Sequence, residues 1–463
     1  MSGIYNTINI GLSGLIAHRQ ALNTSANNLA NANTEGYRKQ TAVLTSAPGY
    51  PTAGSVNSVL GGQWGSGVVA VGAQHSHESY IDLQARLTDS ALGRWNYASS
   101  TLSQVESIIQ PSTDSDIASQ LDAFWSAWQD VSNQPEDLGS RYALQQQAVT
   151  LANAFQDSSQ RLQSLRTSTD LSISSRIDEV NTYTKQIASL NQTIATAQAE
   201  GRFPNDELDQ RDVLIDKLAT LTGAMPFTAE DGNVTIYADG RPLVQGGKSY
   251  DLSYESTTNG IQITSSFDGG SVEISNGEIG GLIQARDVSI PSYLQQLDTL
   301  ASAVVTQVNA LHETGYGLDN STGNDFFVAG GTASTIAVSQ TILDDVQTIA
   351  AGASTDTPGD GSIALSISNL STTSDLNGRT IGEYARALIG LVGDDVSNAS
   401  AQVDSYTAAQ QQIATQQESI SGVSTDEEMA ETLVIQRAYE ACAKLIQIGD
   451  EMIQTVLTMV GNT

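Results

Sequence analysis

The histidines are the first residues that could carry chemistry, and there are four of them: His18, His75, His77 and His312. His75 and His77 could place two imidazoles on one face of a strand, because alternate residues of a strand share a face. Two ligands do not complete a zinc site, which takes three or four. We therefore expect surface or loop histidines, with no metal and no cofactor.

Carboxylates are the second candidates. The chain has 51 Asp and Glu residues, so neighbouring pairs such as Asp344-Asp345 and Asp394-Asp395 are expected by chance. Glycoside hydrolysis needs two carboxylates that face each other across a sugar, and no spacing here defines such a pair. Residues 356–361 are acidic and glycine-rich but lack the ligand set of a calcium loop. We expect a solvated turn there, no catalytic residue and no enzymatic activity.

Length, charge and cysteine usage bound the class of protein. A chain of 463 residues with a net charge of −31 predicts several domains and disfavours nucleic acid and anionic membrane surfaces as partners.

No apolar run is long enough to span a bilayer, so we expect no membrane insertion. The first residues lack a cationic segment, so we expect no cleavable signal peptide. Cys442 is the only cysteine, which excludes internal disulfides, and we expect it to be a small buried apolar residue.

Both ends of the chain carry an apolar seam at helical spacing. Near the start, Ile8, Leu15, Leu22 and Leu29 recur every seven residues. Near the end, the apolar positions alternate steps of four and three along residues 442–460. These patterns predict two long amphipathic helices. Isolated helices of this kind are marginal in water, so the seams need partners, either each other or other chains.

Between the ends the period changes from helix to strand and back. Residues 79–199 predict helices, with Phe124, Trp125 and Trp128 in a core. A coiled-coil-like seam follows at Ile173, Val180, Ile187 and Ile194. Short strands are predicted at 234–237, 252–254, 261–265 and 272–274, because Asp-Gly and Asn-Gly turns punctuate this stretch.

The predicted fold class is mainly α with inserted β: long terminal coiled-coil helices, a helical-bundle rod, and one or two small β-rich outer domains. The chain divides into a terminal helix, a rod interrupted by two inserts, and a second terminal helix. The predicted ranges are 1–40 for the N-terminal helix, 41–223 for the first part of the rod, 224–283 for a β-rich insert, 284–314 for a return helix, 315–375 for a mixed β and loop insert, 376–421 for the last part of the rod, and 422–463 for the C-terminal helix.

Motifs at both ends resemble the signatures of bacterial flagellar axial proteins, the rod, hook and hook-associated proteins. At the start, Gly-Leu-Ser-Gly-Leu lies at 11–15, and an asparagine-rich run from Asn27 leads to Tyr37 and Gln40. At the end, the matching stretches are 421–428, 436–441 and 449–452. The pairing of the two signatures is specific, whereas either alone would be less so.

Segments in the middle are similar to hook-associated proteins of the junction between hook and filament. They are Ala-Phe-Trp-Ser-Ala-Trp at 123–128, Asn-Asp-Glu-Leu-Asp-Gln-Arg-Asp at 205–212, the stretch 285–293, and Gly-Asn-Asp-Phe-Phe at 323–327. The central region is compact compared with many members of that group. The size and number of the outer β domains therefore do not follow from the resemblance.

The resemblance implies a structural subunit of the extracellular flagellum, exported unfolded through the flagellar type III apparatus, that forms a junction ring. Implied partners are identical subunits in the ring, hook protein, a second junction protein (hook-associated protein 3), and a cytosolic export chaperone at the C-terminal region. Three alternatives remain at this point. They are another axial protein of the hook or rod, an acidic extracellular peptidoglycan hydrolase, and a coiled-coil protein of unknown role.

In this interpretation the terminal helices are frayed in the free monomer and become ordered when neighbouring subunits bury their seams. The seams then supply the contacts between subunits by coiled-coil packing. The predicted subunit-interface residues are Ile8, Leu12, Leu15, Leu22, Leu29, Ile435, Tyr439, Cys442, Ile446, Ile453, Val456 and Val460.

Overall fold

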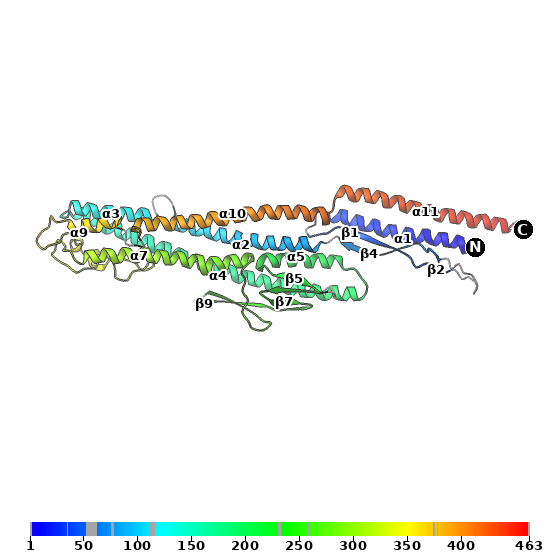
Figure 1. The fold of residues 1–463 in the computed structure, drawn as a ribbon, viewed down its shortest axis with the longest axis horizontal. Helices are drawn as coiled ribbons and strands as arrows, with labels where there is room; N and C mark the ends of the chain where they lie inside the picture. Colours follow the sequence, from blue (N-terminus) through cyan, green and yellow to red (C-terminus); the bar gives the residue numbers. More distant parts are fainter. Residues whose placement is uncertain are drawn as a thin grey trace.

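The computed structural model describes residues 2–34, 36–51, 63–75, 78–111, 116–229, 233–257, 260–373, 376 and 378–461. They form an elongated molecule (Figure 1). A helical rod occupies most of its length, a small β region projects from one side, and helices from the two chain ends extend it at one end. The expected fold class, mainly α with inserted β, is confirmed. Among the described residues, no helix has both the length and the apolar character of a membrane span.

The two chain ends form one antiparallel pair of helices, which we call the terminal hairpin. It consists of α1 (Ser2–Asn31) and α11 (Thr425–Gly461). Beside α1 lies an antiparallel pair of strands, β1 (Gln40–Ser46) and β4 (Val68–His75), which we call the strand ribbon. Two short strands, β2 (Tyr50–Pro51) and β3 (Gln63–Trp64), pair beyond it.

The rod is a bundle of long helices. Its members are α2 (Ser79–Ile109), α3 (Ile117–Asn133), α4 (Leu138–Ala199), α7 (Ile290–His312) and α10 (Ile381–Ser421). The predicted seam at 173–194 lies on one continuous helix, α4, of 62 residues, together with a second apolar stretch at 144–165. Each stretch of α4 serves a different core.

The first core fills the end of the rod that is remote from the terminal hairpin. Phe124, Trp125 and Trp128 are buried there with exposed fractions of 0, 4 and 0%, which confirms their prediction as core. Phe326 and Phe327 arrive from the long connection after α7, and the rings of Trp128 and Phe326 are 5.0 Å apart, centroid to centroid. Aromatic side chains bury large apolar areas, so this cluster stabilises the bundle end.

The prediction of surface or loop histidines is wrong for His312. Its side chain is fully buried on α7, between the aromatic core and the connection that follows. The backbone N–H of Ala350 donates to its Nε2 at 2.9 Å, and its Nδ1 lies 2.7 Å from the carbonyl oxygen of Asn324. Because Nε2 accepts, the proton of the neutral ring is on Nδ1, which donates to Asn324. A buried imidazole with both nitrogens paired is a structural tie between two loops.

The second core lies where the other half of α4 meets α5 (Asn205–Thr222) and the β region. Ile173, Val180 and Ile187 have an exposed fraction of 0%, and Ile194 of 2%, so the predicted seam is buried. It packs mainly on α5 and on strands, with Tyr97 of the long helix α2 at its margin. The strands form a sheet in the order β5 (Met225–Thr228), β6 (Val234–Ala238), β7 (Arg241–Gln245) and β8 (Lys248–Ser249), and a separate hairpin of β9 (Leu252–Thr257) and β10 (Gly260–Ser265).

Three of the four predicted strands are present, as β6, β9 and β10. The fourth, at 272–274, is not a strand: only an isolated bridge at Ser271 remains, and Val272 and Ile274 bury their side chains in the second core. The turn between β6 and β7 has positive φ at Asp239 (48°) and Gly240 (71°), as an Asp-Gly hairpin requires. The predicted turn residues 231, 232 and 259 lie outside the described part of the chain.

One buried arginine ties the β region to the rod. Arg286 lies in a π-helical segment, η1 (Ala285–Ser289), between α6 (Gly277–Gln284) and α7. Its guanidinium donates to Asp170 of α4 at 2.6 Å and to Ser256 of β9 at 2.6 Å, and Tyr254 donates to the same carboxylate at 2.9 Å. Buried charges are tolerated when they are paired and hydrogen-bonded, as here.

The stretch 315–375 was predicted to be mixed β and loop, and the structure differs in part. It contains isolated β-bridges, but its regular elements are short helices. The side chain of Asn309 on α7 pairs with backbone N–H groups of this stretch that would otherwise need a strand as hydrogen-bond partner. Its Oδ1 accepts from the N–H groups of Phe326 (3.0 Å) and Phe327 (2.9 Å). The short helices are α8 (Gln340–Asp344), η2 (Val346–Thr348), α9 (Ser362–Ser368) and η3 (Asn369–Thr372).

Candidate assembly surface

The terminal hairpin is closed by small residues, not by the large apolar ones. A Cβ added to Gly11 would lie 2.9 Å from Ile446 Cγ1, and one on Gly14 would lie 2.7 Å from Cys442 Sγ. On the other helix, a Cβ on Gly449 would meet Ile8 at 2.5 Å. Glycine at these positions therefore lets the two backbones approach closely. The fully buried positions of α1 share this character: Gly11, Gly14, Ala17, Ala21, Ser25 and Asn28.

The sequence seam of α11 is turned toward α1 of the same chain. Ile446 and Cys442 contact the α1 glycines, and Ile8 contacts Gly449. On α1, by contrast, Leu12 and Leu29 remain exposed, with fractions of 48% and 43%. The structure thus brings the two seams together within one chain, and their role between chains stays a prediction. The predicted residues that are half-buried are Ile8, Leu15, Leu22, Ile435, Tyr439, Cys442, Ile446, Ile453 and Val456; the side chain of Val460 lies outside the described residues.

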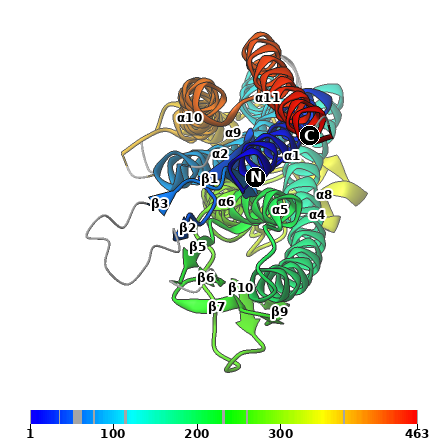
Figure 2. The same ribbon diagram turned by 90° about the vertical axis from the view of Figure 1, so that its right-hand side faces the viewer.

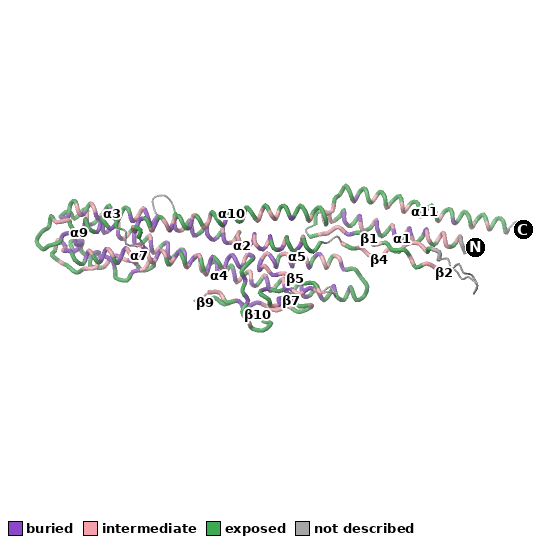
Figure 3. The backbone as a smooth tube through the Cα atoms, in the orientation of Figure 1, coloured by how far each residue is buried: buried purple, intermediate pink, exposed green. Residues whose placement is uncertain are grey.

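A second apolar seam lies on the outside of α11, one residue away from the first. Leu445, Ile448, Met452 and Met459 are exposed by 41, 44, 51 and 70%, and Ala441 continues the row. Their spacing of four, three, four and seven residues places them on one stripe of the helix. Figure 3 shows α11 largely exposed along its length. Sequence reasoning missed this seam, which we call the outer seam of α11, because its residues alternate with those of the stronger first seam.

A buried carboxylate ties the two helices of the terminal hairpin to the turn after α1, at the joint with the rod. Glu428, on the first turns of α11, has an exposed fraction of 1%. Ser25 Oγ of α1 donates to it at 2.6 Å, and Lys39 Nζ lies 3.1 Å from its other oxygen. Burial acts to raise the pKa of Glu428, but the hydrogen bonds from Ser25, Lys39 and Asn28 outweigh it, so its pKa is lowered. The carboxylate therefore stays charged and holds three segments together.

The asparagine-rich signature forms the next layer of this joint. Asn28 Nδ2 donates to the Gln40 carbonyl at 2.8 Å, and its Oδ1 accepts from the Gln40 N–H at 3.0 Å and from the Tyr37 hydroxyl at 2.8 Å. One side chain thus fixes the turn between α1 and β1. Arg38 continues the joint into the rod, pairing with Asp82 of α2 at 2.8 Å and with Asp212 of α5 at 3.5 Å.

The motif at 205–212 anchors the strand ribbon and the joint to the rod. Asn205 Nδ2 donates to the Ala73 carbonyl of β4 at 2.8 Å, and Asp209 lies 3.2 Å from His75 Nδ1. Arg211, at the buried side of α5, donates to Asn191 of α4 at 3.1 Å. The predicted partner of His75, His77, lies outside the described residues.

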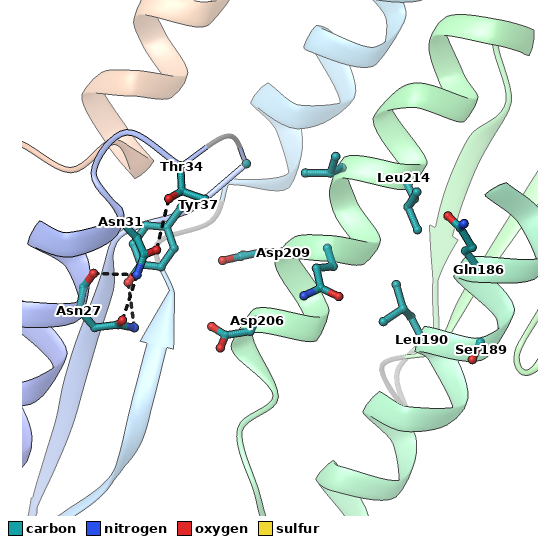
Figure 4. Close-up of a pocket in the computed structure, with 13 residues that line it drawn as sticks. Asn27, Asn31, Thr34, Tyr37, Gln186, Ser189, Leu190, Asp206, Asp209 and Leu214 are labelled. Atoms are coloured by element: carbon teal, nitrogen blue, oxygen red, sulfur yellow. Dashed lines mark hydrogen bonds between the residues drawn. The ribbon is translucent and has the colours of Figure 1, made fainter.

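A cavity of about 720 Å³ opens between this joint and the rod (Figure 4). Asn27, Asn31 and Tyr37 line one side, and residues of α4 and α5, among them Asp206 and Asp209, line the other. Burial raises the pKa of Tyr37 to about 12, and both carboxylates act in the same direction. Across the described part of the chain, no three His, Cys, Asp or Glu side chains gather as a metal site. The cavity wall thus offers amide, hydroxyl and carboxylate groups without a metal cluster.

Family comparisons agree with this division of the chain. A model described as the flagellar hook-associated protein FlgK helical domain matches residues 102–327. The ends match two further models, the flagella basal body rod protein at 8–38 and the flagellar basal body rod FlgEFG protein C-terminal region at 408–459. The terminal matches cover most of α1 and α11, and the central match covers most of the rod and the β region.

Whole proteins give the same result. The chain is 26% identical to flagellar hook-associated protein 1 of Bacillus subtilis, over 100% of this chain and 99% of that protein. It is 32% identical to the protein of the same name from Escherichia coli, over 70% of this chain and 60% of that longer relative. The solved structure of the flagellar hook junction protein FlgK from Burkholderia pseudomallei shares the fold, with a TM-score of 0.66 and 17% identity over 73% of this chain and 100% of that one. The chain belongs to the family of flagellar hook-associated protein 1.

Proposed function

We propose that this structural protein forms a ring at the junction between the flagellar hook and filament, with its terminal helices packed as a coiled coil within each hairpin and the hairpins of neighbouring subunits in contact. The observation that carries the proposal is the outer seam of α11. Leu445, Ile448 and Met452 repeat at coiled-coil spacing and have no partner among the described residues. Burying a Leu, Ile or Met side chain fully gains about 1.5–3 kcal/mol, and these side chains are roughly half-covered already. Each therefore has about 1 kcal/mol left to gain from a neighbour.

The hairpin presents this surface in a suitable place. It extends the rod at one end, so neighbouring hairpins can meet without the acidic rods coming into contact (Figure 1). Leu12 of α1 adds a further exposed apolar side chain on the partner helix. The seam residues that contact the opposite helix, Ile8, Cys442 and Ile446, then stabilise each hairpin from inside.

The proposed partners follow from the same position in the flagellum. They are identical subunits in the ring, hook protein on one side, hook-associated protein 3 on the other, and a cytosolic chaperone that covers the C-terminal helix before export. As a member of this family, the chain belongs to the extracellular flagellum. Export as an unfolded chain through the type III apparatus is compatible with its chemistry, since its single cysteine leaves no internal disulfide to open.

The alternatives fare less well. The relatives matched over the middle of the chain are hook-associated proteins, which favours a junction protein over a hook or rod protein. The same relatives belong to a structural family, which removes the support for a peptidoglycan hydrolase.

The test is a double substitution on the outer seam, Leu445→Asp with Ile448→Asp, in a strain that lacks the native gene. Two charges on the seam prevent its burial, so we expect hooks without filaments by electron microscopy and loss of motility. Leu171→Asp is the matched control, because Leu171 is 70% exposed on the rod, and it should restore filaments. Filaments at the wild-type frequency in the double variant would contradict the proposal. Circular dichroism of the purified variant checks that its rod remains folded.

A further inference from the structure

The strand ribbon carries exposed apolar side chains on β4, and the ring of Phe203, which follows α4, reaches the ribbon at Gly72. Val69 and Val71 of β4 are exposed by 44% and 49%. Residues 40–46 and 68–74 contain no Asp, Glu, Lys or Arg, although the chain as a whole carries a net charge of −31. Like-charged copies of such a chain repel each other, and an uncharged face is where they can approach without that cost.

The ribbon is also incomplete as a sheet. In the described residues no further strand pairs with β1 or β4. Side chains of Asn28, Ser13 and Asn205 bond single backbone groups of the two strands. On its inner side, the N–H of Val68 donates to Ser13 Oγ at 3.2 Å, and Asn28 holds the start of β1. A two-stranded ribbon is marginal alone, and an exposed strand edge with apolar side chains is an interaction site. Thus α1 packs against one side of the ribbon, while Val69 and Val71 stay exposed.

The position of the ribbon relative to α11 indicates how copies would meet. Figures 1 and 2 show α1 lying between α11 and the ribbon, so α11 and the ribbon lie on opposite sides of α1. The two surfaces differ in structure, one a helix stripe and the other a ribbon. Two different surfaces make a heterologous contact, which generates a closed ring or a helical array.

We infer that the outer seam of α11 in one copy packs on the strand ribbon of the next copy. The inference rests on the proposed function and adds to it the two surfaces and their head-to-tail order. Leu445, Ile448 and Met452 supply the helix side, and Val69 and Val71 supply the ribbon side. Each copy then donates a helix to one neighbour and receives a helix from the other.

The experiment uses cysteine pairs placed in different copies of the full chain. Cys442→Ser removes the native thiol, and one chain then carries Val71→Cys while a second carries Ile448→Cys. Both are expressed together in a strain without the native gene, and purified flagella are treated with a short bis-maleimide. We expect a cross-linked dimer that contains one copy of each variant, and no dimer when either variant is expressed alone. Leu171→Cys paired with Val71→Cys is the control and should give none.

Each of the other outcomes contradicts a specific part of the inference or the proposed function. Dimers formed by one variant alone would show a self-complementary contact and overturn the head-to-tail order. Flagella that contain both variants but yield no mixed dimer would overturn the surfaces named here while leaving the junction role intact. Filaments that form on hooks in the strain without the native gene, with no copy of this protein present, would instead contradict the proposed function. Met452→Cys, on the same stripe, replaces Ile448→Cys if the latter prevents assembly, and must give the same mixed dimer.

Discussion

The rod and the terminal hairpin are both built from long helices, but they use their large apolar side chains in opposite ways. The rod places its aromatic and branched residues inside, as Phe124 and Trp128 show with exposed fractions of 0%. The hairpin closes on glycine, alanine and serine, and leaves Leu12 and Ile448 outside. Since large side chains supply most of the burial free energy, the rod is stable by itself, whereas the hairpin keeps much of its apolar area for a neighbour.

The joint between these regions differs from both. Its buried groups are charged or polar, with Glu428, Lys39 and Asn28 at the centre. Hydrogen bonds have defined directions, so a polar joint fixes the angle between hairpin and rod more tightly than an apolar contact does. This gives a physical role to the asparagine-rich signature and to the motif at 205–212, which lie far apart in the sequence.

The strongest test of this difference is to replace one large apolar residue in each region. Trp128→Ala removes a fully buried ring that contacts Phe124 and Phe326, so we expect the rod to lose about 3–5 kcal/mol of unfolding free energy. Leu22→Asp, on the half-buried face of α1, should leave the main thermal transition of the rod in place and prevent assembly. Calorimetry of both purified variants provides the measurement.

The thermal transitions of these two variants show whether hairpin and rod unfold separately. If Leu22→Asp removed the whole thermal transition, the hairpin and rod would be one cooperative unit and the modular picture would fall. Leu171→Ala, at an exposed rod position, serves as the control and should change stability by less than about 0.5 kcal/mol.

Periodicity in the sequence was sufficient to predict the rod and insufficient to predict the surfaces of the hairpin. The heptad at Ile173 to Ile194 and the cluster at Phe124 identified buried faces, because both depend on large apolar residues at helical spacing. The same reasoning passed over Gly11 and Gly14, since it weights large side chains, whereas close helix contact selects small ones. It also overlooked the outer seam of α11, which is offset by one residue from the seam that was recognised.

Two other features could not be read from the sequence for different reasons. The burial of His312 depends on the Ala350 and Asn324 backbone, which only the folded connection supplies. The joint depends on residues such as Lys39 and Glu428 that are distant in the chain and carry no periodic pattern. Tertiary hydrogen bonding decides both, and it leaves no local signal.

A smaller effect on the rod is expected from the titration of His312. Burial lowers the pKa of His312 to about 4; Arg141 acts in the same direction, while the Asn324 hydrogen bond and Asp325 oppose the shift. The unfolded chain has a histidine pKa near 6.5 and so binds the proton first. The contribution of neutral His312 to stability is therefore fully present above pH 6.5 and is lost as pH falls toward 4, by up to about 3 kcal/mol.

Urea denaturation at pH 7.0, 5.5 and 4.5 measures this term, followed by tryptophan fluorescence from the rod core. His312→Gln cannot gain the proton, so its stability should fall less steeply over this range than that of the wild type, even as carboxylates titrate in both. Parallel pH profiles for the two chains would show that His312 contributes nothing to the pH dependence.

The smallest free-energy cost is expected for local opening of the terminal hairpin in the free monomer. With few large side chains buried between α1 and α11, we expect amides of residues 5–29 to exchange through local opening that costs only a few kcal/mol, well before the α4 amides at 173–194. Assembly should slow the same amides, because neighbours then bury the outer seam of α11 and the exposed side of α1. Hydrogen exchange with mass spectrometry on monomer and purified flagella makes the comparison directly. Slow exchange throughout 5–29 in the monomer, equal to that of α4, would mean that the hairpin is stable without a neighbouring subunit. The two regions would then differ in shape and not in stability.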